Sequence, residues 1–146
     1  MKNNDILLNP NELVQFLKKP ANDFTRDDII RFIEAKGITM VNFRYVAEDG
    51  KLKSLNFVPF SRDHLVSILT AGERVDGSSL FSFVGSGSRD LYVIPRYRTA
   101  FVNPFTTTPA LEILCSFYDN EGKPLESSPE YILKKACTRF MNKTGL

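Results

Sequence analysis

The sequence predicts an α+β fold, and three observations support this class. The chain has 146 residues, of which 42% are hydrophobic and 25% charged, enough for one hydrophobic core. Apolar residues recur at helical spacing before Gly37 and alternate with polar residues after it. An Asp-Gly pair lies between the first two alternating segments, as in a β-hairpin. Helices are therefore expected first and strands after them.

Two helices are expected in the first third of the chain. The first should begin at Asn9, with Pro10 at its first helical position, and should end before Pro20. The second should begin at Thr25 and end at Gly37, because glycine readily adopts the left-handed conformation of a helix end.

A β-hairpin is expected next. Residues 41–45 alternate in polarity as a half-buried strand does. Asp49-Gly50 predicts a type I′ turn, in which both central residues need positive φ, and the return strand should cover about residues 51–58. A short helix capped by Ser61 and closed by Gly72 should follow. A hairpin followed by a helix across the sheet is how a β-grasp fold, a ubiquitin-like roll, begins.

Two more strands and a last helix complete the pattern. Strands are expected at residues 91–94 and 111–118, and a helix should open at Ser128-Pro129. We therefore expect a mixed sheet with packed helices: a β-grasp domain at 38–146, preceded by a helical amino-terminal segment at 1–37. The inward face of the last helix is expected to consist of Ile132, Leu133, Ala136, Cys137 and Phe140.

Composition argues against several classes of protein. No apolar run approaches the roughly 20 residues that cross a bilayer, and the first residues are too polar for a secretory signal. The net charge is only +2 and the basic residues are scattered, so no nucleic-acid surface is indicated. Cys115 and Cys137 stand in no metal-binding pattern and are expected to be free thiols. These features favour a cytoplasmic globular protein with neither a membrane nor a nucleic acid as partner.

The middle of the chain, residues 73–105, combines glycines with phenylalanines that follow no regular period. Two interpretations stay open for these aromatic side chains. They could fold back on their own sheet, or some could face a partner chain or a second domain, since an exposed apolar patch usually marks a contact. The residues concerned are Phe81, Phe83, Phe101 and Phe105.

One motif in this region resembles a known family. Val75-Asp76-Gly77-Ser78-Ser79-Leu80 is similar to the Asp-Gly-Ser-Ser loop of glutamine synthetases. Four turn-forming residues are a weak signal alone, but other segments similar to that family flank them in the same order, over about residues 38–146. These segments are Val41-Asn42-Phe43-Arg44-Tyr45, Asp49-Gly50-Lys51, Val58-Pro59, Ser88-Arg89-Asp90-Leu91, Ile94-Pro95, Thr99-Ala100-Phe101-Val102-Asn103-Pro104-Phe105, and the helix from Pro129 to Arg139.

The resemblance implies the amino-terminal β-grasp domain of an ATP-dependent glutamate–ammonia ligase that forms a homo-oligomeric ring. In that family each active site lies between this domain and the carboxyl-terminal catalytic domain of a neighbouring subunit. The larger domain supplies the ligands of Mg²⁺ or Mn²⁺, the ATP site and most glutamate contacts. The sequence stops before such residues would begin, so alone this chain is expected to hold no cofactor and to be inactive.

The family's reaction also implies roles for three residues of the motif. Ammonium must be held near a γ-glutamyl phosphate and must lose a proton, and a carboxylate can serve as counter-charge and as proton acceptor or relay. The resemblance gives the catalytic role to Asp76, with Ser79 positioning Asp76 or the ammonium. Gly77 would let the backbone turn sharply near the neighbouring subunit. The alternative for Asp76 is a turn residue that binds its own backbone.

Other polar residues are weaker candidates for the site. Asp90 could be a second acidic contact at the subunit boundary or a solvated loop charge. His64, the only histidine, is expected on a surface helix without a catalytic role. Four arginines could contact an anionic substrate or a neighbouring subunit, or could simply be solvated: Arg74, Arg89, Arg96 and Arg98.

The chain also departs from the family's usual residues. Ala47 stands where many relatives carry an aspartate, and Ser54 stands where a histidine is frequent. Phe83 replaces a frequent tryptophan, and Arg96 follows Pro95 where an acidic residue is usual. These departures leave three alternatives open: a ligase relative that uses another amine, a relative that has lost activity, and a non-catalytic β-grasp interaction module.

Overall fold

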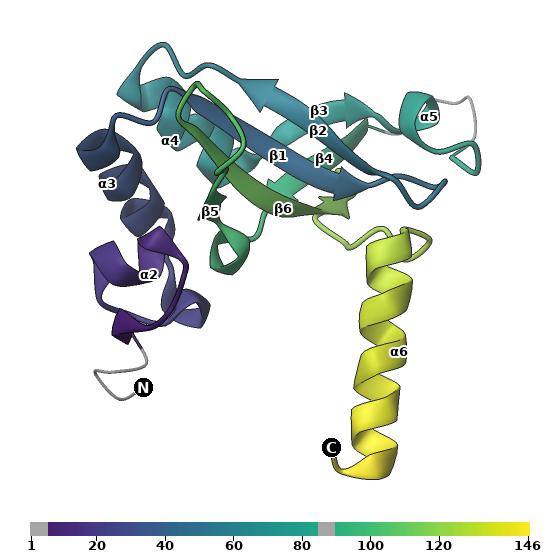
Figure 1. Ribbon diagram of the computed structural model, residues 1–146. Helices are drawn as coiled ribbons and strands as arrows, with labels where there is room; N and C mark the ends of the chain where they lie inside the picture. Colours follow the sequence, from purple (N-terminus) through teal and green to yellow (C-terminus); the bar gives the residue numbers. More distant parts are fainter. Residues whose placement is uncertain (1–5, 85–89) are drawn as a thin grey trace.

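The computed structural model describes residues 6–84 and 90–146, and a mixed β-sheet lies at the centre of the described chain (Figure 1). Its strand order is β2-β1-β6-β4-β3, and β5 pairs with β6 beside this path. Strand β6 runs parallel to β1 and antiparallel to β4 and β5. The strands are β1 (Met40–Val46), β2 (Leu52–Phe57), β3 (Glu73–Asp76), β4 (Asp90–Pro95), β5 (Phe101–Val102) and β6 (Ala110–Tyr118).

Helices account for most of the remaining described chain. The α-helices are α2 (Glu12–Leu17), α3 (Arg26–Lys36), α4 (Arg62–Ala71), α5 (Gly77–Leu80) and α6 (Pro129–Thr144), with short 3₁₀ turns at Ala21–Asp23 and Tyr97–Thr99. The β1–β2 hairpin followed by α4 confirms the predicted β-grasp opening. In the described part of the chain, no helix is both long and apolar enough to cross a lipid bilayer.

The helix ends follow the capping residues, with one correction. Thr25 and Asp28 form the capping box of α3, and Gly37 ends this helix with a left-handed backbone, as predicted. The predicted start at Asn9 is wrong, because Asn11 caps α2 by accepting a hydrogen bond from the backbone N–H of Leu13. The side chain of Asn9 instead accepts a hydrogen bond from the backbone N–H of Asn11, the capping residue that precedes the helix.

The predicted type I′ turn of the hairpin is also wrong. Strand pairing ends at Val46 and Leu52, so the loop is longer than the two residues of such a turn. Gly50 has a φ of 77°, whereas Asp49 is not among the described residues with positive φ. The N–H of Gly50 closes the turn on the carbonyl of Ala47 at 3.0 Å. The turn therefore needs positive φ at Gly50 but not at Asp49.

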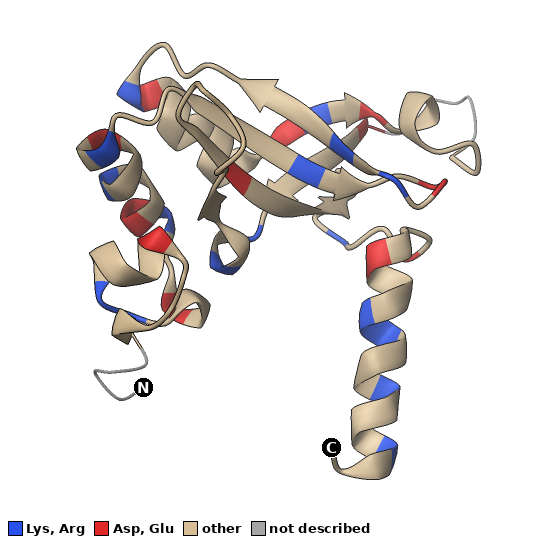
Figure 2. Ribbon diagram, in the orientation of Figure 1, with Lys and Arg blue, Asp and Glu red and all other residues tan. Residues whose placement is uncertain are grey.

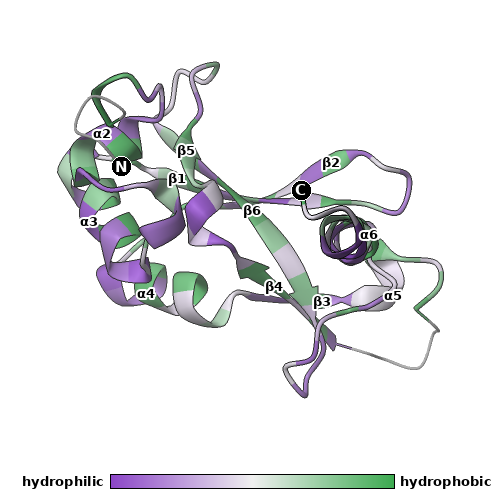
Figure 3. Cartoon of the chain, turned by 90° about the horizontal axis from the view of Figure 1, so that it is seen from below, coloured by the Kyte–Doolittle hydropathy of each residue, from purple (hydrophilic) through white to green (hydrophobic). Residues whose placement is uncertain are grey.

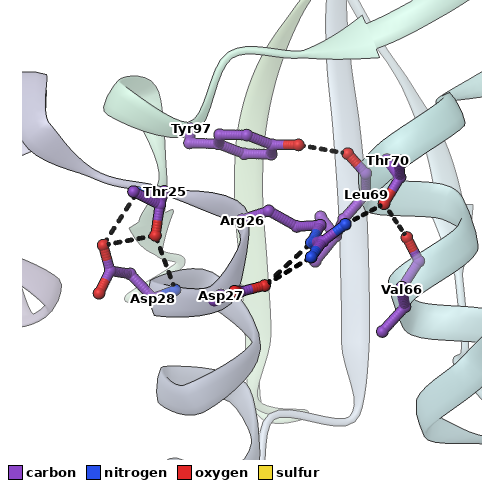
Figure 4. A network of polar contacts seen from close by, with 8 residues as sticks. All are labelled: Thr25, Arg26, Asp27, Asp28, Val66, Leu69, Thr70 and Tyr97. Atoms are coloured by element: carbon purple, nitrogen blue, oxygen red, sulfur yellow. Dashed lines mark hydrogen bonds and ion pairs between the residues drawn. The ribbon is translucent and has the colours of Figure 1, made fainter.

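The hydrophobic core lies between one face of the sheet and helices α2, α3 and α4. Alternate side chains of β1 and β6 enter it, and the helices add apolar residues from the other side. Figure 4 shows how the start of α3 and the 3₁₀ turn Tyr97–Thr99 each bind the end of α4. Arg26 donates to the hydroxyl of Thr70 at 3.1 Å, and Tyr97 donates to the carbonyl of Leu69 at 2.6 Å. These contacts fix the end of α4, where β3 begins.

Strand β6 is buried on both faces, although its alternating sequence predicts one face toward solvent. Glu112, only 1% exposed, is surrounded by polar groups from neighbouring segments. Its carboxylate accepts hydrogen bonds from Asn42 at 2.9 Å and Asn103 at 2.7 Å, and pairs with the guanidinium of Arg44. This network joins β1, β6 and the residue after β5 through one buried charge.

The predicted inward face of the last helix is wrong. Helix α6 has no buried residue, and Ile132, Leu133 and Phe140 are each more than half exposed. Figure 1 shows α6 extending away from the sheet, and Figure 3 shows it end-on, apart from α3 and α4. Its first turn is held by Glu130, which accepts from the hydroxyl of Ser116 at 3.0 Å and pairs with Arg96 at 3.2 Å. Periodicity identified the apolar stripe, but not what covers it.

Gly72 should be intolerant of any side chain. It combines a φ of 70° with a ψ of −160°, a region open essentially to glycine alone. A Cβ at this position would lie 2.2 Å from the carbonyl oxygen of Val93. We expect Gly72→Ala to lower the free energy of unfolding by at least about 2 kcal/mol, measured by chemical denaturation. Gly37→Ala is the control, because Gly37 has positive φ but open space around it, and should cost about 1 kcal/mol. Equal costs for both variants would contradict the steric conflict at Gly72.

Glu112 should make stability depend on acid pH. Burial alone would raise the pKa of Glu112, but hydrogen bonds from Arg44, Asn42 and Asn103 outweigh burial and hold this pKa below its ordinary value. A carboxylate with a lowered folded-state pKa stabilises the fold above the unfolded pKa, and that contribution is lost as pH falls through the folded pKa.

We therefore expect Glu112→Gln to be about 1–3 kcal/mol less stable than wild type at pH 7. The gap should narrow below about pH 4.3, where unfolded glutamate takes up protons. Denaturation curves of both proteins between pH 7 and pH 3 measure this difference in the free energy of unfolding. A gap that stays constant over this range would show that the charge of Glu112 does not contribute.

Candidate functional site

The Asp-Gly-Ser-Ser motif lies where edge strand β3 ends and helix α5 begins (Figure 1). Asp76 is the last residue of the strand and also caps the helix. Its Oδ1 accepts from the backbone N–H of Ser78 at 3.0 Å and from the Ser78 hydroxyl at 2.7 Å. The hydroxyl of Ser79 donates to the backbone carbonyl of Asp76 at 2.8 Å. Asp76 and Ser79 are thus brought together by the hydrogen bond of the Ser79 hydroxyl to the main chain of Asp76.

The carboxylate of Asp76 is exposed and charged. Hydrogen bonds from the Ser78 hydroxyl and then from the Ser78 N–H hold the pKa of Asp76 below its ordinary value, so it is ionised at neutral pH. Both side-chain hydrogen bonds described for it reach Oδ1, and within residues 6–84 and 90–146 none reaches Oδ2. The carboxylate therefore caps α5 while its negative charge stays exposed to solvent.

Asp90 is the direct neighbour of Asp76 across strands β3 and β4. Opposed residues of an antiparallel pair place their side chains on the same face, so two carboxylates share this edge of the sheet. Asp90 is paired with Arg74 at 3.2 Å, whereas Asp76 forms no ion pair with any of the residues that the structure describes. Figure 2 shows acidic residues at this end of the sheet, next to α5.

An aromatic anchor fixes the segment that follows the motif. Phe81 ends α5 and is only 1% exposed. Its ring meets Phe117 of β6 edge-on at a centroid distance of 4.9 Å, and Phe117 meets Tyr45 of β1 in the same way at 5.5 Å. The loop that carries Asp76 is therefore attached to the centre of the sheet.

The phenylalanines of the middle segment differ in burial. Phe81 folds back on its own sheet, whereas Phe83 and Phe101 are about half exposed and Phe105 is 94% exposed. Phe83 stacks on Phe81 at 5.0 Å, so an aromatic face lies beside the motif.

Other predicted residues occupy other places. Gly77 is buried and is the first residue of α5, a helical position that does not require positive φ. His64 stacks on Phe60 at 4.2 Å, on α4 at the other end of the sheet (Figure 1). Arg96 pairs with Glu130 of α6. Arg98 lies in the 3₁₀ turn Tyr97–Thr99, and the predicted segment around Ser88 and Arg89 lies outside the described residues.

Comparison with known proteins identifies the family. A family model described as "Glutamine synthetase, beta-Grasp domain" matches residues 37–120, more than half of the chain. This chain belongs to the glutamine synthetase β-grasp domain family. Its motif, residues 75–80, lies inside the matched segment.

Similar sequences include two glutamine synthetases. That of Thermotoga maritima is 31% identical over 113 residues, which is 76% of this chain and 25% of the relative. That of Methanococcus maripaludis is 26% identical over 125 residues, covering 82% of this chain and 28% of the relative. A 3-hydroxylaminophenol mutase of Cupriavidus pinatubonensis is 29% identical over 123 residues, covering 82% of this chain and 25% of the relative. The chain thus spans about a quarter of the length of the curated relatives it matches.

A solved structure has the same fold. The glutamine synthetase of Plasmodium falciparum superposes with a TM-score of 0.67 at 18% identity, over 86% of this chain and 24% of that protein. Within residues 6–84 and 90–146 of this glutamine synthetase β-grasp domain, no three His, Cys, Asp or Glu side chains gather as metal ligands.

Removing the Phe81 ring should loosen the motif and destabilise the domain. We expect Phe81→Ala to lower the free energy of unfolding by about 3–5 kcal/mol, because a fully buried aromatic side chain leaves a cavity. Phe105→Ala, which removes the same group from an exposed position, should change it by less than about 0.5 kcal/mol. Denaturant titration of both variants measures the difference, and similar small losses would refute the anchor.

Proposed function

We propose that this chain is part of an ATP-dependent glutamate–ammonia ligase and completes an active site shared with the carboxyl-terminal catalytic domain of a neighbouring subunit. The observation that supports this function is the position of Asp76. An ionised carboxylate stands at the sheet edge, where the end of one strand and a buried aromatic anchor hold its loop. Binding residues are commonly placed in this way, on a loop carried by a rigid scaffold.

The chemistry that Asp76 can supply is mainly electrostatic. Ammonium carries a full positive charge, and a carboxylate with a lowered pKa remains negative when the cation arrives. The same low pKa makes Asp76 a weak base, so a proton taken from ammonium would be passed on quickly to solvent or a stronger base. Asp76 thus acts as the counter-charge of ammonium and as a proton relay. Ser79 and Gly77 hold the loop in which it stands.

The exposed stripe of α6 supports contact with a further domain. Apolar side chains recur along one side of this helix, and a contiguous exposed apolar surface usually marks an interface. We assign this contact to the catalytic domain, within a homo-oligomeric ring. That domain would hold ATP and Mg²⁺ or Mn²⁺, since the described part of this chain offers no group of metal ligands.

A ligase that accepts another amine is the second candidate. Phe83 presents a half-exposed ring beside the motif, and an aromatic face can bind an alkylammonium through cation–π attraction. Such an enzyme would release phosphate faster with an alkylamine than with ammonia. A cytoplasmic location fits either enzyme, because both described cysteines carry free thiols.

Asp76→Asn in the full-length protein separates the two roles of this residue. Asparagine caps helices about as well as aspartate, so the loop should keep its conformation and the melting temperature should change little. The charge is lost, and we expect glutamate- and ammonia-dependent phosphate release from ATP to fall by about 100-fold or more. Asp76→Ala should lose both the cap and the activity.

The controls decide among the candidates. Glu121→Ala removes an exposed acid that pairs with Lys123 in the turn after β6, and it should leave phosphate release unchanged. Wild-type release that depends on methylamine but not ammonia would favour the second candidate. Release that depends on no amine, or that survives in Asp76→Asn, would contradict the ligase site and favour an interaction module.

A further inference from the structure

A second contact reaches the motif from the β1–β2 hairpin. Glu48, in the turn after β1, accepts from the backbone N–H of Ser82 at 2.8 Å and from the Ser82 hydroxyl at 2.9 Å. The partners are 34 positions apart in the sequence. Both hydrogen bonds end on one carboxylate oxygen, Oε2. Figure 1 shows the hairpin tip and α5 at the same end of the molecule.

This contact ties the loop to the β1–β2 hairpin, in addition to the attachments that hold it to the sheet. The entrance of α5 is held by pairing of Asp76 with Asp90 in the sheet. Its exit is held by the buried ring of Phe81, whose N–H also closes the helix on the carbonyl of Gly77 at 2.9 Å. The bonds from Ser82 to Glu48 restrain the backbone directly after this ring and connect it to the β1–β2 hairpin.

We propose that Glu48 is a positioning residue for the Asp76 loop: by holding Ser82 it fixes the direction in which α5 presents the Asp76 carboxylate. The inference rests on the proposed function, because it assigns Glu48 a part in binding ammonium. In this proposal Glu48 acts on the ammonium site indirectly, through Ser82 and α5.

The bonding pattern allows positioning to be separated from a direct effect of charge. A glutamine side chain has one carbonyl oxygen with two lone pairs, so Glu48→Gln can accept both hydrogen bonds without a negative charge. Glu48→Ala removes both bonds. If Glu48 positions the loop, glutamine restores function; if its charge attracts ammonium, glutamine does not.

Steady-state kinetics of the full-length protein provide the first test. We expect Glu48→Ala to raise the KM for ammonium roughly fivefold, with kcat and the KM values for glutamate and ATP nearly unchanged. Glu48→Gln should match wild type. Ser82→Ala, which keeps the backbone N–H, should have a smaller effect than Glu48→Ala and should add little to it in the double variant.

The outcomes separate failure of this inference from failure of the ligase function. Equal KM increases in Glu48→Gln and Glu48→Ala would overturn positioning in favour of charge. No effect of either, with Asp76→Asn inactive, would also overturn positioning while the ligase function stands. Absence of any amine-dependent turnover in wild type would reject the ligase function instead.

Amide hydrogen exchange tests the positioning without any catalysis. We expect Glu48→Ala to accelerate exchange roughly tenfold at Ser82, at Ser78, which donates to Asp76, and at Phe81, which donates to Gly77. Glu48→Gln and the control Glu121→Ala should exchange as wild type does. Unchanged exchange at Ser78 and Phe81 in Glu48→Ala would overturn the inference, whatever the kinetics show.

Discussion

The burial of β6 on both faces is the constraint on which the rest of the structure depends. Side chains on one face of this strand form the core, and on the other face Glu112 and Ser116 bind polar side chains of neighbouring segments. A slip of one residue would exchange the two sets, bringing Glu112 into the core in place of Leu111 or Ile113, so the register with β1, β4 and β5 is strongly specified. Glu112 itself contributes to that specification, because its bonded partners lie on neighbouring segments.

The functional elements are attached along this same strand. Phe117, near its end, holds Phe81 and with it the Asp76 loop. Ser116, on the opposite face, holds Glu130 and with it the first turn of α6. The proposed ammonium loop and the exposed helix are thus attached, through side-chain contacts, to adjacent residues on opposite faces of one strand. A rigid strand that carries two exposed elements suits a domain whose partners lie outside the chain.

Helix-capping residues and alternating polarity predicted the elements that depend on neighbouring residues in the sequence. The caps at Thr25 and Ser61, and the alternation in β1, placed their helices and strand correctly. Glu112 could not be recognised, because a glutamate in an alternating strand is normally solvated and its partners are distant in sequence. The outward position of α6 was missed for a related reason: a periodic stripe indicates contact but not with what. Strand β3 has only four residues, too few for a pattern, and the role of Asp76 came from family resemblance rather than from spacing.

Subunit mixing most directly tests the sharing of an active site between neighbours. Full-length Asp76→Asn subunits would be mixed or co-expressed with subunits inactivated at a metal-binding carboxylate of the catalytic domain. If each site joins the loop of one subunit to the catalytic domain of the next, roughly a quarter of the sites in mixed rings have two intact halves, and amine-dependent phosphate release returns. If the mixed oligomers form and remain as inactive as their parents, the loop does not serve a neighbouring subunit.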